Sequence, residues 1–279
     1  HHAEGMLFLM VHSIPTYSLT RLAREWLAED TPNFDPAGVC VGSEEVEAKL
    51  LCKTPHTVLA GSPFFTAVFT EVGCTVDWMY QEGAVIVTAV VRGPARCLLL
   101  GERPALNCLS RASGIATRCS QLQLTAKSAG WHGEVAGTRK TTPGFRLVEK
   151  YAMLVGGTSM HRQDLSGMVM LKDNHVWGIS KLLSSRNKTL TAELSSTHFH
   201  ISPLQELHVA ARDLKNEFPS LQIEASGGVT PENVASYFSS HVDIISLGCI
   251  TQGCPVSDFS LKVQKPGEKN NAPPLPIYS

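Results

Sequence analysis

From Gly130 onwards the chain alternates between short apolar segments and longer amphipathic ones, and this rhythm constrains the fold more than any other feature of the sequence. Alternating strands and helices predict a parallel sheet, since each helix returns the chain to the start of the next strand. The expected strands cover residues 134–138, 167–171, 189–194, 221–225 and 243–247. The expected crossover helices cover residues 145–154, 204–218 and 231–238. The fold class is therefore α/β, with the sheet either open or closed into a barrel.

The region before residue 130 predicts a smaller unit of mixed helices and strands. Apolar residues between Leu19 and Leu27 recur at the spacing of an amphipathic helix, which we expect over residues 18–29. Short apolar or alternating runs, broken by glycine and proline, predict strands at 56–60, 74–79 and 84–91. The length of 279 residues allows either one large domain or two ordinary ones.

A long helix-like stretch runs from Ala95 to about Gln123. Pro94 precedes it, and leucine and isoleucine residues supply its buried face. Pro104 lies inside the stretch and removes a backbone donor. It must therefore either kink the helix or divide it in two, with Arg103 held at the break.

These changes of pattern predict the domain organisation. We expect an N-terminal extension over residues 1–15, an α/β domain over residues 16–110 and a barrel-like α/β domain over residues 111–262. Residues 263–279 form a tail whose prolines favour an extended or disordered chain.

The charge balance excludes several classes of function. The 24 Lys and Arg residues nearly match the 25 Asp and Glu residues, which excludes a generally basic nucleic-acid binder and requires any important positive charge to be local. The apolar run over residues 6–11 is too short to span a bilayer, and no Lys or Arg precedes it as in a signal peptide. We therefore expect a cytoplasmic protein that binds neither nucleic acid nor membrane.

The eight cysteines include no CxxC pair and lie mostly in apolar stretches. This pattern favours reduced and mostly buried thiols in a reducing compartment, in agreement with the cytoplasm.

Charged side chains gather beside the ends of the expected strands, where the loops of a parallel α/β fold converge on a ligand. The cations of this rim are Arg139, Lys140, His161, Arg162 and Lys172. One carboxylate, Glu193, lies near the end of the expected strand 189–194. Such an excess of cations predicts a ligand with several negative charges, such as phosphates together with carboxylates.

The run Ser226-Gly227-Gly228 predicts a phosphate cup, because small residues let backbone N–H groups approach an anion closely. Thr230 and Pro231 look like the N-cap and first residue of a helix, and a helix N-terminus favours anions. Gly248 follows the next strand, as in the phosphate sites of many barrels. The alternative is that these glycines only form tight turns.

Other common sites are absent from the sequence. His198 and His200 would share one face of a strand, but no cysteine or further histidine completes zinc spacing. The chain also lacks a Walker A motif, a GxGxxG run after a strand and a Gly-x-Ser-x-Gly motif. The usual nucleotide and esterase signatures are therefore missing.

Five segments together resemble the quinolinate phosphoribosyltransferase family. They are residues 107–117, residues 137–146 with the run Thr-Arg-Lys-Thr-Thr-Pro-Gly, His161-Arg162, Lys172-Asp-Asn-His175 and Glu224-Ala-Ser-Gly-Gly228. The similarity extends from about Leu19 to Lys262. It implies an N-terminal α/β sandwich domain followed by an incomplete α/β barrel. It also implies a homo-oligomer, a dimer or a hexamer, whose sites form between chains.

The resemblance implies a reaction in NAD synthesis that joins quinolinate to phosphoribosyl pyrophosphate and releases pyrophosphate and CO₂. It implies Mg²⁺ as cofactor with Glu193 as its ligand, and Glu193, Lys140 and Lys172 as catalytic residues. Arg103 would come from the neighbouring subunit. The full implied substrate-binding set is Arg103, Thr138, Arg139, Lys140, His161, Arg162, Lys172, Glu193, Ser226, Gly227, Gly228 and Gly248.

Two features depart from the family pattern. The interval from Lys172 to Ser226 is shorter by about one βα unit, so the barrel is expected to be shortened there, and Pro104 directly follows Arg103. A second hypothesis is therefore a non-catalytic or splice-shortened relative that binds anionic ligands and assembles with itself or with an intact paralogue. A third, an unrelated phosphate-binding isomerase barrel, leaves the Thr-Arg-Lys-Thr-Thr-Pro-Gly run unexplained.

Overall fold

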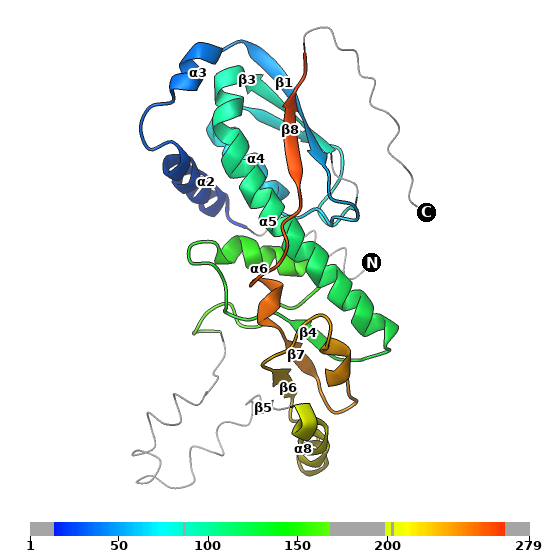
Figure 1. The fold of residues 1–279 in the computed structure, drawn as a ribbon. Coiled ribbons are helices and arrows are strands. Elements are labelled where there is room, and N and C mark those ends of the chain that lie inside the picture. Colours follow the sequence, from blue (N-terminus) through cyan, green and yellow to red (C-terminus); the bar gives the residue numbers. More distant parts are fainter. Residues whose placement is uncertain (1–13, 86–87, 168–198, 202–203, 266–279) are drawn as a thin grey trace, which may run out of the picture. The chain divides into compact units, whose positions relative to one another are not determined.

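The computed structural model describes residues 14–85, 88–167, 199–201 and 204–265. The chain divides into two compact units, one of His1–Ser113 with Val256–Ser279 and one of Gly114–Pro255 (Figure 1). Within the described residues, none of the helices combines the length and the apolar character that crossing a membrane requires.

The first unit contains a four-stranded antiparallel sheet in the order β2-β3-β1-β8 (Figure 1). Its strands are β1 (Glu45–Cys52), β2 (Thr75–Trp78), β3 (Thr88–Pro94) and β8 (Phe259–Val263). In β1 the side chains of Ala48 and Leu50 are buried while Glu45 is exposed, as expected for a strand with one face on the core.

Three helices accompany this sheet: α2 (Thr16–Asp30), α3 (Pro36–Val41) and α4 (Ser62–Glu71). Phe65 of α4 packs against Phe69 and against Trp78 of β2, with ring centroids 4.9 Å and 5.3 Å apart. The indole Nε1 of Trp78 donates to Thr66 Oγ1 at 2.9 Å, so the polar end of this partly buried ring is satisfied. Aromatic packing thus fixes α4 on the sheet.

Helix α5 (Ala95–Ser128) is a single helix of 34 residues with Pro104 inside it. The expected helix is confirmed, and Pro104 does not divide it. Pro104 is buried, whereas Arg103 before it is exposed. The boundary between the two units falls within α5, after Ser113.

The second unit contains a parallel sheet in the order β4-β7-β6-β5, which confirms the predicted parallel architecture (Figure 1). This sheet is not closed among the described residues, as expected for an incomplete barrel. Its strands are β4 (Glu134–Ala136), β5 (Phe199–Ile201), β6 (Ile223–Ser226) and β7 (Ile244–Ser246). The helices are α6 (Arg146–Val155), α8 (Leu204–Glu217) and the 3₁₀ turns η1 (Val234–Tyr237) and η2 (Gly248–Ile250).

Two predicted elements are wrong. Residues 56–60 form a loop instead of a strand, because the backbone of Leu59 pairs with Gly83 and Ala84 and the N–H of Ala60 donates to Ser113 Oγ. Residues 231–238 hold only the 3₁₀ turn η1 instead of a helix. Strands β1 and β8 and helices α3 and α4 were not predicted.

The C-terminal boundary of the predicted barrel domain differs from the structure. Residues 259–262 were assigned to that domain, but they belong to β8, which pairs with β1 in the first unit from Cys52↔Phe259 to Ala48↔Val263. The chain therefore returns to its first sheet after the second unit is complete.

Several expectations lie outside the described residues. They concern the expected strand 167–171 after its first residue, the strand at 189–194, Lys172, Glu193, His198 and the tail from residue 266.

All eight cysteines lie in the described part of the chain, and none of them is in a disulfide. Four of them are buried, and Cys40 is exposed. Burial raises the pKa of the Cys119 thiol to about 12 and that of the Cys74 thiol to about 11. Because the thiolate is the reactive form, these two thiols are protected by both burial and protonation.

We expect thiol labelling to separate these groups. At pH 8 the exposed Cys40 of the native protein should react first with a chromogenic disulfide reagent, and Cys74 and Cys119 should not react. In guanidinium all eight should react. Rapid labelling of Cys74 or Cys119 in the native protein, identified by peptide mass, would show that the burial described above is wrong.

Candidate active site

The parallel strands of the second unit end at the same level. Ala136 of β4 lies beside Ser246 of β7, and Ser246 lies beside Ser226 of β6. Ser159 pairs with Ala136 in an isolated parallel bridge. The segments that follow these four residues therefore start from one edge of the sheet, where parallel α/β folds bind their ligands.

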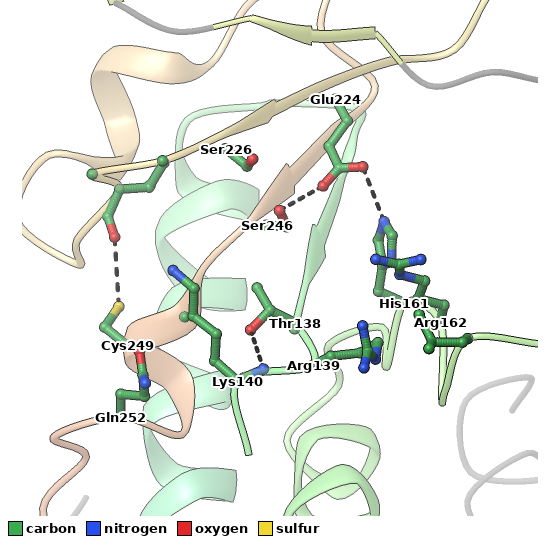
Figure 2. A pocket seen from close by; sticks show the side chains of 16 residues that line it. Thr138, Arg139, Lys140, His161, Arg162, Glu224, Ser226, Ser246, Cys249 and Gln252 are labelled. Atoms are coloured by element: carbon green, nitrogen blue, oxygen red, sulfur yellow. Dashed lines mark hydrogen bonds and ion pairs between the residues drawn. The ribbon is translucent and has the colours of Figure 1, made fainter. Parts of the chain in front are cut away.

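A pocket of about 450 Å³ lies at this edge, a volume suited to a small-molecule ligand (Figure 2). Nine sequence-predicted site residues line it, namely Thr138, Arg139, Lys140, His161, Arg162, Ser226, Gly227, Gly228 and Gly248. The structure thus brings together residues that are up to 110 positions apart in the chain, Thr138 and Gly248. Seven other lining residues were not predicted, namely Gly137, Leu165, Glu224, Val229, Ser246, Cys249 and Gln252.

Arg139 is the pocket cation that most clearly requires a hydrogen-bonding ligand. Its Nε is buried and has no hydrogen-bond partner among the described residues. A buried donor without a partner costs free energy, and a guanidinium suits a carboxylate or phosphate geometrically. An anion in the pocket would supply that partner.

The loop that carries Arg139 and Lys140 is fixed through its backbone. The N–H of Lys140 is fixed at the turn, because it donates a hydrogen bond to Thr138 Oγ1 at 3.0 Å. The carbonyl of Lys140 accepts a hydrogen bond from the buried hydroxyl of Thr251 at 2.5 Å. The backbone is therefore held at both polar groups while the Lys140 side chain is exposed on the pocket.

His161 and Glu224 face each other at the wall of the pocket (Figure 2). His161 Nε2 lies 3.0 Å from Glu224 Oε2, and the hydroxyl of Ser246 donates to Glu224 Oε1 at 2.6 Å. Both partners of the His161–Glu224 pair are almost fully buried. Each oxygen of this carboxylate is therefore engaged by a protein group, which reduces its repulsion of an anionic ligand.

After β6 the groups available to an anion are the backbone N–H groups of a glycine turn, and not the N-terminus of a helix. Gly227 and Gly228 have φ angles of 93° and 67°, which other residues adopt rarely, and both are exposed. Asn233 closes the turn, since its Oδ1 accepts from Thr230 N and its Nδ2 donates to Gly228 O. The predicted helix end is absent, so any phosphate cup here depends on the glycine backbone.

Gly248 provides space for Lys140. A Cβ atom at this position would lie 2.9 Å from Lys140 Cδ and 3.4 Å from its Nζ. The absence of a side chain at residue 248 thus sets where the Lys140 ammonium can lie.

Three predicted site residues are not placed in the pocket. Arg103 is an exposed residue of the first unit. Lys172 and Glu193 lie outside the described residues. The described residues also contain no group of three His, Cys, Asp or Glu side chains that could hold a metal ion.

Glu224 is the most informative of the residues that sequence reasoning missed. It lies in the expected strand 221–225, two positions before Ser226, and alternation along β6 places both residues on the same face. An acidic residue inside an otherwise apolar strand is a signal for a paired, buried charge. Its partner His161 is 63 residues away, and the sequence alone did not identify that pair.

Comparison with known protein families matches both parts of the chain to the two domains of a single family. The model described as "Quinolinate phosphoribosyl transferase, N-terminal domain" matches residues 34–113. The model of the C-terminal domain matches residues 115–202 and 198–262. These two pieces meet within the interval where the sequence is expected to be short of one βα unit.

Named relatives are similar over nearly their whole length. The human nicotinate-nucleotide pyrophosphorylase (carboxylating) is 45% identical over 94% of this chain and 95% of its own. The protein of the same name from Rattus norvegicus is 45% identical over 95% of this chain and 96% of its own. The solved structure of nicotinate-nucleotide pyrophosphorylase from Francisella tularensis has a TM-score of 0.74 at 25% identity, covering 91% of this chain and 99% of that one.

We expect Gly248→Ala to weaken anion binding. The added methyl group would displace Lys140 from its present position, so the dissociation constant for inorganic pyrophosphate should rise by about tenfold. Isothermal titration calorimetry measures this change.

Gly167→Ala is the matched control. A Cβ at residue 167 would make only ordinary contacts, at 3.9 Å, and Gly167 does not line the pocket. Equal pyrophosphate affinity in Gly248→Ala and Gly167→Ala would contradict the role of Gly248.

Proposed function

The chain belongs to the quinolinate phosphoribosyl transferase family, and from this premise we propose that it transfers the phosphoribosyl group of phosphoribosyl pyrophosphate to quinolinate. The products are nicotinate mononucleotide, pyrophosphate and CO₂, a step of NAD synthesis. The protein is then a pentosyltransferase. The observation that carries the proposal is the buried and unpartnered Nε of Arg139, within a pocket that also presents Lys140 and Arg162.

Quinolinate carries two carboxylates, and the pocket offers cationic groups for both. In our proposal Arg139, His161 and Arg162 bind these carboxylates, with Lys172 completing the set. Arginine suits this role because its guanidinium pairs with a carboxylate through two parallel hydrogen bonds.

The phosphoribosyl donor would occupy the other side of the pocket. Lys140 contacts its phosphates, and the turn Ser226–Gly228 with Gly248 holds the 5-phosphate through backbone N–H groups and the Ser226 hydroxyl. Thr138 lies beside Lys140 and completes the lining there.

The transfer step needs orientation more than it needs a proton donor. The ring nitrogen of quinolinate forms a bond to C1 of the ribose while the bond from C1 to the pyrophosphate oxygen breaks with its electron pair. Both reactants are anions that repel each other in water, and fixed cations hold them within reacting distance. Each such fixed charge contributes on the order of 10²–10³ to the rate when it matches charge that develops in the transition state.

Decarboxylation follows from the charge of the product ring. After transfer the ring nitrogen is cationic, and this stabilises the carbanion that remains at C2 when the carboxylate leaves as CO₂. A proton from solvent then replaces the lost group.

Mg²⁺, Glu193 and Lys172 remain parts of the proposal. Mg²⁺ commonly binds through substrate phosphates with one or two carboxylates, so pyrophosphate oxygens and Glu193 would hold it. Lys172 and Glu193 would act beside Lys140 as catalytic residues. We further propose a cytoplasmic homo-oligomer, a dimer or a hexamer, in which Arg103 reaches the site of a neighbouring subunit.

Turnover is the direct test of the function. Quinolinate, phosphoribosyl pyrophosphate and Mg²⁺ should yield equal amounts of pyrophosphate, CO₂ and nicotinate mononucleotide. Arg139→Ala should reduce kcat/KM by at least about 10²-fold, because a pocket cation is lost. Arg212→Ala removes an exposed arginine of α8 and should change nothing.

Two outcomes would reject the active enzyme. Turnover by the wild-type chain no greater than that of Arg139→Ala would contradict the proposed reaction. Thermal stabilisation by quinolinate without turnover would instead support the alternative of a non-catalytic or splice-shortened relative, which the shortened interval suggests.

Mixed oligomers test whether Arg103 acts across subunits. Arg103→Ala and Arg139→Ala should each be nearly inactive alone. Co-expressed in equal amounts, they should recover about a quarter of the wild-type turnover, because half of the dimers are mixed and each mixed dimer has one intact site. If mixed dimers form without any recovery, Arg103 does not act in the partner's site.

A further inference from the structure

Helix α6 contacts both loops that carry the pocket cations. The first cationic loop holds Arg139 and Lys140, and the second holds His161 and Arg162. Arg146 Nε donates to Thr141 Oγ1 at 2.9 Å, next to the Arg139–Lys140 turn. Glu149 accepts two hydrogen bonds from Thr142, from its N–H and its hydroxyl, each at 2.9 Å. The first turn of α6 thus fixes the end of the first cationic loop.

Lys150, one position further along α6, reaches the second cationic loop. Its side chain is 1% exposed and does not line the pocket. Its Nζ donates to the carbonyl of Met160 and lies 3.4 Å from the carbonyl of Arg162, which it also contacts as a donor. One ammonium group therefore holds the carbonyls on both sides of His161.

His161 has a backbone conformation that needs such support. Its φ angle is 55°, and His56 is the only other non-glycine residue with positive φ in the described part of the chain. A residue with a Cβ atom stays in this conformation only when its surroundings enforce it. The N–H of His161 donates to Ser159 Oγ at 3.2 Å, and its ring pairs with Glu224, so the local geometry is fixed at several points.

The charge of Lys150 is costly at this position. Burial, together with the nearby charges of Arg146 and Arg139, lowers the pKa of Lys150 to about 8. An apolar side chain would fill the same space without that cost, since burying a charge is unfavourable unless hydrogen bonds compensate it. The two carbonyls beside His161 are the groups that the ammonium satisfies.

We propose that Lys150 is a positioning residue that holds His161 and Arg162 in the geometry required to bind the carboxylates of the substrate. This role rests on the proposed function for the identity of the ligand. Without the Lys150 ammonium, the chain at residue 161 would relax from its left-handed conformation, and the two side chains would leave their places on the pocket wall.

Lys150→Met tests this role, because methionine keeps most of the buried volume but donates no hydrogen bond. We expect the KM for quinolinate to rise by at least about tenfold, as for the loss of charged hydrogen bonds. The KM for phosphoribosyl pyrophosphate should change by less than about threefold, since its proposed contacts lie on other loops. Hydrogen exchange followed by mass spectrometry should show amides of residues 160–163 exchanging about tenfold faster.

Val148→Ala is the matched control on the same helix. Val148 is buried without a polar role in α6, so its truncation destabilises the fold but leaves both cationic loops in place. It should alter neither the quinolinate KM nor local exchange at 160–163. If Lys150→Met matches Val148→Ala in exchange at 160–163, the proposal is overturned, whether or not the wild-type chain shows turnover. Absence of wild-type turnover would reject only the proposed function.

Discussion

The site depends on the register of three short parallel strands. Ala136, Ser246 and Ser226 end at one level because the hydrogen bonds between β4, β7 and β6 fix their register, and a slip of β6 against β7 would separate Glu224 from Ser246. A shift of one residue in any of them would move its loop by more than 3 Å and turn its side chains to the other face. The positions of the pocket loops are therefore set by the register of the sheet. Its cations also repel one another, so they stay together only because their loops are anchored through backbone groups and through α6.

Regular elements were predicted where the sequence carries a clear period. Helix α5 and the strands β4, β6 and β7 were found because their apolar residues recur regularly and the turn residues beside them are distinct. The failures have separate causes. Residues 56–60 are as apolar as a strand, but side-chain and loop partners satisfy their backbone. Helix α4, with its phenylalanines, has a composition that also suits a strand, and Thr230 and Pro231 signal a helix start that continues only as a 3₁₀ turn.

The functional residues divide in the same way. Residues proposed to bind the ligand were predicted from short local runs and from the family resemblance, and nine of them line one pocket. The residues that orient them were not predicted, since Glu224 meets His161 across 63 positions and Lys150 acts on carbonyls, which leave no mark in the sequence. Sequence motifs thus indicate candidate binding groups, whereas the structure is needed to identify the residues that hold those groups in position.

The position of strand β8 in the chain affects the order in which the protein can fold during synthesis. Its five residues, Phe259–Val263, complete the sheet of the first unit, although they lie near the end of the chain. During synthesis the ribosome releases residues 45–52 long before their neighbour exists, so one edge of β1 stays unpaired until the second unit has been made. Unpaired edges invite association with other chains, and a nascent chain is exposed to that hazard for most of its translation. A chain stopped before residue 259 would lack this strand, so its first unit would be unfinished even though most of its sequence is present.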